Sequence, residues 1–346
     1  MNAATLDQIR HMTTPAARQG HLLDDKTILV TGGTGSFGRR FIEHVLAVAR
    51  PKKLIVFSRD ELKQYELRQA LPKVHDDVMR YFIGDVRDAS RLQRAFHGVD
   101  IVVHAAALKQ VPACEYNPFE AVMTNVIGAR NVIDAAVDQG VAKVLALSTD
   151  KAVNPVNIYG ATKLCAEKLI TQANAYAGYG EKSTRFACSR YGNVIGSRGS
   201  VVPVFQEQRR TGRVTVTDER MTRFWLTLDE GVAFVLRCLE HMQGGEIFVP
   251  RIKSMRITDL VKAVAPDCKV EVIGIRPGEK LHEALLSEDE ARNTLALPDM
   301  YVVLPSHEEA RQDLWSKGDR LPEGFRYASD TNDQWMTADD LSKLVS

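Results

Sequence analysis

Short apolar runs rich in β-branched residues alternate with amphipathic stretches along the first two thirds of the chain. The runs are TILVTGG at 27–33, LIVFS at 54–58, VMRYFIGD at 78–85, DIVVHAAA at 100–107, KVLALSTD at 143–150 and TRFACSRYGN at 184–193. Helical spacing predicts helices through Phe41 and Val48, from Glu61, near Leu92 and from about Tyr159. Apolar strands between amphipathic helices are typical of βαβ units around a parallel sheet buried on both faces. The pattern therefore predicts an α/β, Rossmann-like doubly wound fold with about six strands.

The pattern changes after Asn193, where turns and separated arginines predict a smaller, interleaved C-terminal substrate lobe. The helical pattern and the strand EIFVP within 227–250 are expected to return to the main sheet. We therefore expect a cofactor-binding Rossmann domain over 26–195 with 227–250, and a substrate lobe with its tail over 196–226 and 251–346. Residues 1–25 contain no apolar segment typical of a secretory signal and are expected to form a mobile extension.

Charge and cysteine content exclude several classes of protein. Lys+Arg of 45 against Asp+Glu of 44 gives a net charge of +1, so no global field favours nucleic acid or an anionic membrane. No apolar run approaches the ~20 residues that span a bilayer. The 5 cysteines show no paired spacing and the 9 histidines no metal-binding spacing. We expect a soluble, cytoplasmic protein without a metal, a nucleic-acid partner or a membrane partner.

The stretch TGGTGSFG follows the first strand directly and opens a helix. Gly33, Gly35 and Gly38 satisfy G-x-G-x-x-G, while Gly32, Gly35 and Gly38 satisfy G-x-x-G-x-x-G, so spacing leaves the subclass open. Glycines permit a tight turn, and the helix N-terminus presents N–H groups to a pyrophosphate. The predicted cofactor contacts in this turn are Gly32, Thr34, Gly35, Ser36, Phe37 and Gly38.

The second and third strands end in residues suited to the rest of a dinucleotide. Ser58 and Arg59 stand where an NAD enzyme usually carries a carboxylate, and an arginine pairs with a 2′-phosphate, so NADP is favoured over NAD. Asp60 nearby leaves NAD open, and Arg59 could instead be a solvated charge. Asp85 suits an adenine amino group or caps the next helix. We also expect Val86, Ala105, Ala106 and Ala107 to line the cofactor site.

Two pairs of proton-handling residues lie close together in the sequence. Tyr159 and Lys163 are one helical turn apart and share a face. The lysine's ammonium is expected to lower the pKa of the tyrosine, so that a phenolate accepts a hydroxyl proton while hydride leaves for nicotinamide. Thr149 can hydrogen-bond the same hydroxyl. Asp150 and Lys151 form a second acid and base, or alternatively a surface ion pair at a strand end.

Taken together, TGGTGSFG, AALKQVP, STDKAVNP, YGATK and RYGNV resemble the soluble, inverting UDP-N-acetylglucosamine 4,6-dehydratases of the extended short-chain dehydrogenase/reductase family. The similarity runs from Lys26 to about residue 290. It implies an NADP-dependent hydro-lyase that transiently oxidises sugar C4, eliminates water across C5 and C6, and returns hydride to C6. Reprotonation of C5 with inversion then gives UDP-2-acetamido-2,6-dideoxy-β-L-arabino-hex-4-ulose.

The residue at position 151 distinguishes inverting dehydratases from retaining ones. The resemblance makes Asp150 and Lys151 the acid and base of elimination, and retaining glucose dehydratases carry a glutamate where Lys151 stands. As a base Lys151 must be neutral, which requires a pKa lowered by desolvation or by the charge of Lys163 or oxidised nicotinamide. A retaining dehydratase, an epimerase or a reductase remains the alternative. A silent NADP sensor is disfavoured because Tyr159 and Lys163 are both present.

Arginines in the predicted loops suit a diphosphate, because guanidinium groups pair bidentately with phosphate oxygens. The resemblance places RYGN and RPGEK at the nucleotide-sugar site and Lys109 near the sugar, although Lys109 could instead cap a loop. The implied partners are UDP-N-acetylglucosamine or a similar UDP-amino sugar, and further copies of the chain in a homo-oligomer. Pseudaminic acid and other deoxyamino sugars of polysaccharide remain open as products downstream. The predicted substrate contacts are Lys109, Asn193, Arg198, Arg220, Arg223, Arg276 and Glu279.

Overall fold

The computed structural model describes residues 20–178, 180, 183–196, 201–305, 315 and 317–345. Its largest feature is a sheet of ten strands in the order β16-β14-β15-β10-β6-β5-β4-β1-β2-β3. Neighbouring strands from β3 to β10 pair in parallel, and β15, β14 and β16 continue the sheet with antiparallel pairing. The order 3-2-1-4-5-6 confirms the doubly wound, Rossmann-like prediction. The parallel strands are β1 (Thr27–Thr31), β2 (Lys53–Ser58), β3 (Met79–Ile83), β4 (Ile101–His104), β5 (Lys143–Leu147), β6 (Arg185–Ser189) and β10 (Ile247–Pro250).

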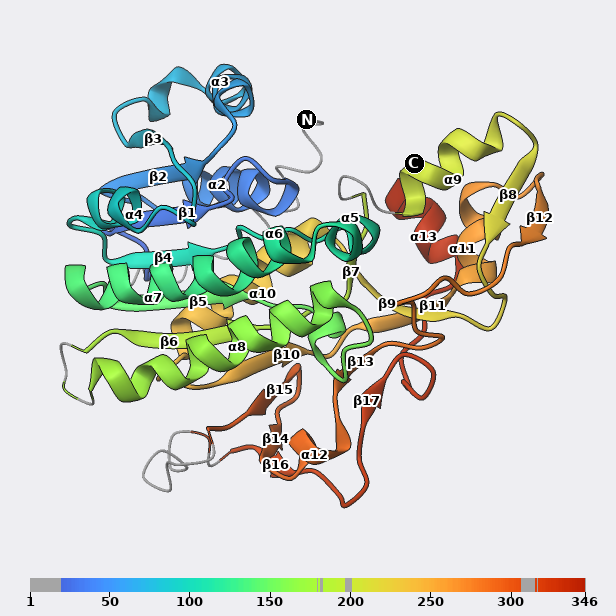
Figure 1. Cartoon of the computed structure of the whole chain (residues 1–346). Helices are drawn as coiled ribbons and strands as arrows, with labels where there is room; N and C mark the ends of the chain where they lie inside the picture. Colours follow the sequence, from blue (N-terminus) through green and yellow to red (C-terminus); the bar gives the residue numbers. More distant parts are fainter. Residues whose placement is uncertain are drawn as a thin grey trace.

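Helices cover both faces of the sheet (Figure 1). Alternate residues of each strand point to opposite faces, so Val30 joins one hydrophobic cluster and Leu29 the other. Phe41 of α2 packs in the first cluster, and Ile170 of α8 packs in the second. The first face carries α2 (Ser36–Val48) and α10 (Leu228–His241), and the second carries α4 (Ala89–Phe96), α7 (Gly128–Gln139) and α8 (Ile158–Ala177).

Short elements connect this framework at the ends of its strands. Helix α3 (Glu61–Ala70) and the 3-10 turn η1 (Lys73–His75) join β2 to β3. Between β4 and α7 lie α5 (Val111–Tyr116), α6 (Pro118–Val122) and the π-helical turn η2 (Met123–Ile127). The 3-10 turn η3 (Asp150–Ala152) joins β5 to α8. The connections that follow β4 and β5 contribute to the rim of the sheet where ligands bind in such folds.

The smaller lobe contains three small sheets. One is β11-β9-β7, with β7 (Asn193–Val194), β9 (Thr222–Leu226) and β11 (Lys253–Arg256). The others pair β8 (Arg213–Val216) with β12 (Lys269–Val272), and β13 (Ala284–Leu286) with β17 (Tyr327–Ala328). A separate hydrophobic cluster, with Phe205, Trp225 and Leu260 among its members, forms the core around the first two of these sheets. The third sheet packs in the second cluster of the main sheet, through Leu285, Leu286 and Tyr327. The helices of the lobe are α9 (Val201–Arg209), α11 (Ile257–Val264), α12 (Glu288–Ala291) and α13 (Ala338–Val345).

The two parts interleave along the chain. Strand β10, within 227–250, pairs with β6 in the main sheet. The sheet also takes up β14 (Thr294–Ala296), β15 (Met300–Val303) and β16 (Asp319–Arg320). Part of 251–346, expected to be substrate lobe and tail, therefore lies in the main sheet, which is why the sheet exceeds the expected six strands.

The start of the described chain is a packed turn. Leu23 is fully buried, and Asp24 accepts hydrogen bonds from the N–H groups of His21 and Arg50. The last residues of the predicted mobile extension 1–25 are therefore held against the sheet domain, and residues 1–19 lie outside the described residues. Among the helices that the structure describes, none combines the length and apolar character needed to cross a membrane.

Candidate active site

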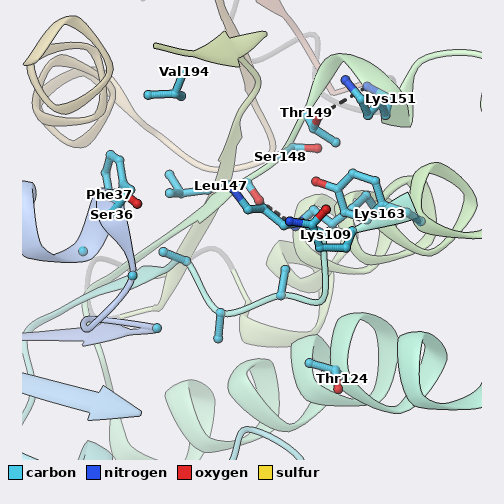
Figure 2. Close-up of a pocket in the computed structure, with 18 of the residues that line it drawn as sticks. Ser36, Phe37, Lys109, Thr124, Leu147, Ser148, Thr149, Lys151, Lys163 and Val194 are labelled. Atoms are coloured by element: carbon cyan, nitrogen blue, oxygen red, sulfur yellow. Dashed lines mark hydrogen bonds between the residues drawn. The ribbon is translucent and has the colours of Figure 1, made fainter. Parts of the chain in front are cut away.

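A cavity of about 1050 Å³ lies at the carboxyl ends of the parallel strands. Strand order reverses between β1 and β4, which is where open α/β sheets bind ligands. The glycine turn after β1 lines one part of the cavity, while η3 and the start of α8 line another. Figure 2 shows Ser36 and Phe37 on one side of this cavity and Lys151 on the other.

Close main-chain approaches explain the glycine turn. Gly32 has a φ of +65°, and a Cβ there would lie 2.9 Å from Ala106 Cα. A Cβ on Gly38 would lie 2.5 Å from Gly33 Cα, so α2 can begin against the turn only with glycine. The N-cap residue Gly35 provides no side-chain cap, which suits a helix N-terminus that receives a phosphate. The predicted contacts that line the cavity here are Gly32, Thr34, Gly35, Ser36, Phe37 and Gly38.

The end of β2 presents a guanidinium group to the cavity. Arg59 lines it with a side chain 54% exposed, and its Nη1 lies 3.6 Å from Asp85 Oδ2. Ser58 is buried and accepts a hydrogen bond from Gln64 Nε2 at 3.0 Å. Asp60, which left NAD open, caps α3 by accepting a hydrogen bond from the N–H of Lys63 at 3.0 Å. The carboxylate is thus engaged in a helix cap, and the arginine remains at the rim.

Asp85 and its neighbours line the next part of the cavity. Asp85 Oδ2 accepts a hydrogen bond from Arg87 Nη2 at 2.7 Å. Burial raises the pKa of Asp85, but the Arg87 hydrogen bonds outweigh it and hold the pKa below its usual value. Asp88, not Asp85, caps the following helix, since its Oδ1 accepts from the N–H of Arg91 at 3.0 Å. The other predicted residues that line this region are Val86, Ala105, Ala106 and Ala107.

Tyr159 and Lys163 lie buried on the first turns of α8. The helix begins here because Asn157 Oδ1 accepts a hydrogen bond from the N–H of Gly160 at 2.7 Å. A Cβ on Gly160 would lie 2.2 Å from Lys151 O, so only glycine lets the helix start against η3. Lys163 Nζ donates to Leu147 O at 2.7 Å, as Figure 2 shows.

The pKa of Tyr159 is not lowered by Lys163 as the sequence predicted. Burial raises the pKa of Tyr159 to about 12, while the Lys151 charge and hydrogen bonding with Thr149 oppose the rise. Burial also lowers the pKa of Lys163. The predicted lowering of the tyrosine pKa by Lys163 is therefore not what the structure shows, because that ammonium is directed to Leu147 O and Lys151 supplies the opposing charge.

Asp150 and Lys151 form an ion pair inside the cavity. Asp150 is fully buried, and its Oδ1 accepts hydrogen bonds from Thr149 Oγ1 at 2.8 Å and Lys151 Nζ at 3.1 Å. The Lys151 side chain is 23% exposed and lines the cavity. Asp150 Oδ2 is buried without a hydrogen-bond partner among the described residues. The alternative of a solvated surface pair is excluded by this burial.

The pKa of Lys151 moves in the direction opposite to our expectation. Burial lowers it, but the carboxylates of Asp150 and Glu283 outweigh burial and raise the pKa above its ordinary value. The prediction of a lowered pKa is therefore wrong for this arrangement. Two acidic side chains, one of them from the substrate lobe, stabilise the ammonium.

Glu283 is a site residue that the sequence analysis missed. Its Oε1 lies 3.6 Å from Lys151 Nζ, and its Oε2 lies 3.6 Å from Lys280 Nζ. The only signal in the sequence is its position four residues after Glu279 in RPGEKLHEALL. That spacing does not reveal that the loop folds back onto η3, since the contact depends on the path of the whole lobe.

Three predicted substrate contacts line the cavity, namely Lys109, Asn193 and Glu279. Burial and the charge of Lys151 lower the pKa of Lys109. The loop that carries Lys109 is fixed by Asn125, which accepts from the N–H of Leu108 and donates to its carbonyl, both at 2.9 Å. Lys109 is an exposed residue of the cavity lining.

The predicted arginines do not converge in the described part of the site. Arg220 is exposed and pairs with Asp218 at 2.7 Å. Arg223 donates to the carbonyls of Lys280 and Leu281, which fixes the loop that precedes Glu283. Arg276 is exposed, and none of these three is among the described residues that line the cavity. Local partners hold the guanidinium groups of Arg220 and Arg223, and Arg198 lies outside the described residues.

The chain is similar in sequence and in fold to known proteins. A profile described as "Polysaccharide biosynthesis protein" matches residues 28–305. The UDP-N-acetylglucosamine 4,6-dehydratase (inverting) of Campylobacter jejuni is 49% identical over 94% of this chain and 98% of its own length. A UDP-glucose 4-epimerase of Rickettsia conorii is 45% identical over 81% of this chain and 83% of its own. The X-ray structure of Pen from Bacillus thuringiensis has a TM-score of 0.84 and 37% identity over 93% of this chain and 98% of that one.

Proposed function

Since this chain belongs to the polysaccharide biosynthesis protein family of short-chain dehydrogenases/reductases, we propose that it is an inverting UDP-N-acetylglucosamine 4,6-dehydratase. One observation carries this proposal. A buried acid and an amine, Asp150 and Lys151, lie 3.1 Å apart in the same cavity as Tyr159 and Lys163. An enzyme that only oxidises and reduces a hydroxyl needs Tyr159 and Lys163 but not Asp150 and Lys151.

The cofactor proposed is NADP in preference to NAD. The glycine turn admits a pyrophosphate at the start of α2, and Arg59 stands at the cavity rim where a 2′-phosphate pairs with a guanidinium group. Asp60, engaged as the cap of α3, disfavours the ribose contact typical of NAD enzymes. When bound, the nicotinamide would accept hydride from sugar C4 and return it to C6.

Tyr159 is proposed to take the proton from the C4 hydroxyl, with Thr149 holding that hydroxyl. Burial makes the phenol a weak acid, so the phenolate needs stabilising positive charge. Lys151 supplies part of this charge, and Lys163 lies one helical turn away on the same helix face. Lys151 thus prepares the base for the first step, while the Lys163 ammonium is directed to Leu147 O.

Asp150 and Lys151 are proposed to carry out the elimination. One proton transfer across their hydrogen bond turns the ammonium and carboxylate into an amine and a carboxylic acid. The amine takes the proton from C5, which is acidic next to the C4 ketone, and the C5–C6 double bond forms as the C6–O bond breaks. The acid protonates the departing hydroxyl, which leaves as water. The raised pKa of Lys151 describes the pair before this transfer.

The proposed substrate is UDP-N-acetylglucosamine or a similar UDP-amino sugar. Lys109, Asn193 and Glu279 line the cavity and are proposed to contact it. Arg198, Arg220, Arg223 and Arg276 remain predictions for the diphosphate, and for Arg220 and Arg223 the geometry favours other partners. A homo-oligomer in the cytoplasm also remains a prediction of the resemblance.

Incubation of the purified protein with UDP-N-acetylglucosamine and NADP, without added reductant, tests the proposal. We expect a product lighter by one water, with an inverted C5 centre by NMR and no net change in the cofactor. The Rickettsia relative makes epimerisation the second candidate. An isomer of unchanged mass would support that candidate, a C5 of retained configuration would support a retaining dehydratase, and net reduction of NADP to NADPH would support a reductase that works in the oxidative direction.

A further inference from the structure

A second buried carboxylate lies beside the proposed base, and it comes from the substrate lobe. Glu283 directly precedes β13, which packs against η3. Its side chain is 4% exposed, and its Oε1 lies 3.6 Å from Lys151 Nζ. The N–H of Glu283 donates to Ser329 Oγ at 3.0 Å, and its carbonyl accepts from the N–H of Ser329 at 2.8 Å. These bonds fix the point from which the carboxylate enters the site.

Two other cations face the same carboxylate, but main-chain contacts anchor both. Lys280 Nζ lies 3.6 Å from Glu283 Oε2 and donates to Val153 O at 2.6 Å. Arg223 Nε lies 4.0 Å from Glu283 Oε1, and its Nη atoms donate to the carbonyls of the preceding loop. Glu283 Oε2 is buried without a hydrogen-bond partner among the described residues. A buried carboxylate requires such compensating charge, and Lys151 provides the part that lines the cavity.

We propose that Glu283 is a positioning residue for Lys151, which holds the amine at the lobe junction and keeps it protonated until the proton passes to Asp150. This inference rests on the proposed function, since it assigns a partner to the base of that reaction. Five groups from different elements face the amine, and they are Asp150, Glu283, Arg223, Tyr159 and Lys109. Because the two carboxylates outweigh burial and Arg223, removing one of them should release the proton at lower pH.

A labelling experiment tests the inference without substrate. The intact protein is treated briefly with acetic anhydride at a fixed mildly alkaline pH, and acetylation of Lys151 is followed by mass spectrometry. Only the neutral amine reacts. In Glu283→Gln we expect Lys151 to react about 10-fold faster or more, since an opposite charge at this distance shifts a pKa by about one unit or more. Glu271→Gln, an exposed glutamate in the same lobe, should leave the rate unchanged.

The rate of water loss gives a second readout. Plotted against pH, its acid limb should move to lower pH in Glu283→Gln and coincide with the wild type in Glu271→Gln. An unchanged Lys151 acetylation rate together with an unmoved limb would overturn the inference and leave the proposed dehydratase standing. A wild-type protein that never releases water would overturn the proposed function, and the acetylation rates would still decide the role of Glu283. If Glu283→Gln does not fold, Glu283→Asp should give a smaller rise in the same direction.

Discussion

The cavity contains several buried or partly buried ionisable side chains whose charges depend on one another. Lys151 is stabilised as an ammonium by Asp150 and Glu283, and its charge in turn opposes the rise in the pKa of Tyr159. The charge of Lys151 also lowers the pKa of Lys109, in the same direction as its effect on Tyr159. A change at any one of these positions should therefore alter the protonation of the others, so that single substitutions report on the group as well as on one residue.

At the scale of single residues, the sequence predicted which residues form the site better than it predicted their charge states. Tyr159, Lys163, Asp150 and Lys151 were identified because local spacing on a strand end and a helix start brings them together. The charge on Lys151 depends on Glu283, which is 132 positions away in the sequence and reaches the site only through the fold. Local sequence patterns contain no information about such a contact.

The cofactor preference provides a prediction for a single residue. Arg59→Asp should weaken NADP binding about 10-fold or more, because a charge-assisted hydrogen bond contributes roughly 1.5–3 kcal/mol and the new carboxylate repels the 2′-phosphate. NAD binding should weaken less. Titration of both cofactors by fluorescence measures the ratio. Arg94→Asp, an exposed site on α4, is the matched control, and equal losses for both cofactors would contradict the role of Arg59.

Among the elements, the start of α8 is positioned by its contact with η3. Gly160→Ala would place a Cβ 2.2 Å from Lys151 O, so η3 must move or the helix must shorten. We expect water loss to fall about 100-fold or more, while NADP binding at the distant glycine turn persists. Gly231→Ala on α10 has an ordinary 3.5 Å contact and should be nearly neutral. Full turnover of Gly160→Ala would show that this packing does not position the site.

A buried ion cluster joins α8 to the substrate lobe. Arg190 is fully buried and contacts both Glu167 and Glu290, the latter at 2.6 Å. Arg190→Met leaves Glu167 buried without its partner, so the free energy of unfolding should fall by about 3–5 kcal/mol. Denaturant unfolding measures the loss. Adding Glu167→Met should recover part of it, and a double variant less stable than the single one would contradict this explanation.

The strands were predictable to different degrees. Those from β1 to β6 appeared in the sequence as apolar runs, and burial on both faces explains this for all of them except the edge strand β3, which is only partly buried. Strands β14 to β16 have two to four residues each and lie at the end of the sheet, so their pattern is too short to indicate a strand. The arginines of the lobe were misplaced for a similar reason, because Arg220 and Arg223 contact partners that only the lobe fold brings near.

For the molecule as a whole, the substrate lobe and the sheet domain cannot be separated at one linker. The chain crosses between them several times, and β10, β14, β15 and β16 complete the main sheet (Figure 1). Side chains also tie the lobe to the active site. Asn157 Nδ2 donates to Gly278 O at 2.8 Å, and Lys280 Nζ donates to Val153 O at 2.6 Å. The lobe that is proposed to bind the sugar is thereby fixed against η3.

This interleaving predicts one cooperative unfolding transition. Far-UV and near-UV circular dichroism should give coincident curves, and saturation with NADP at ~100 times its Kd should stabilise the whole chain by about 2.7 kcal/mol. If the far-UV and near-UV unfolding curves do not coincide, the lobe unfolds separately from the sheet domain.

The central claim is that the amine of Lys151 removes the C5 proton after C4 has been oxidised. The most direct test is a single turnover of Lys151→Met with UDP-N-acetylglucosamine and NADP in deuterated water, after cofactor binding has shown that the variant is folded. We predict that reduced nicotinamide forms more slowly, because Tyr159 loses the charge of Lys151, but then accumulates, that C5 keeps its original hydrogen, and that water loss slows about 100-fold or more. Water loss at the wild-type rate, with deuterium at C5, would contradict the claim.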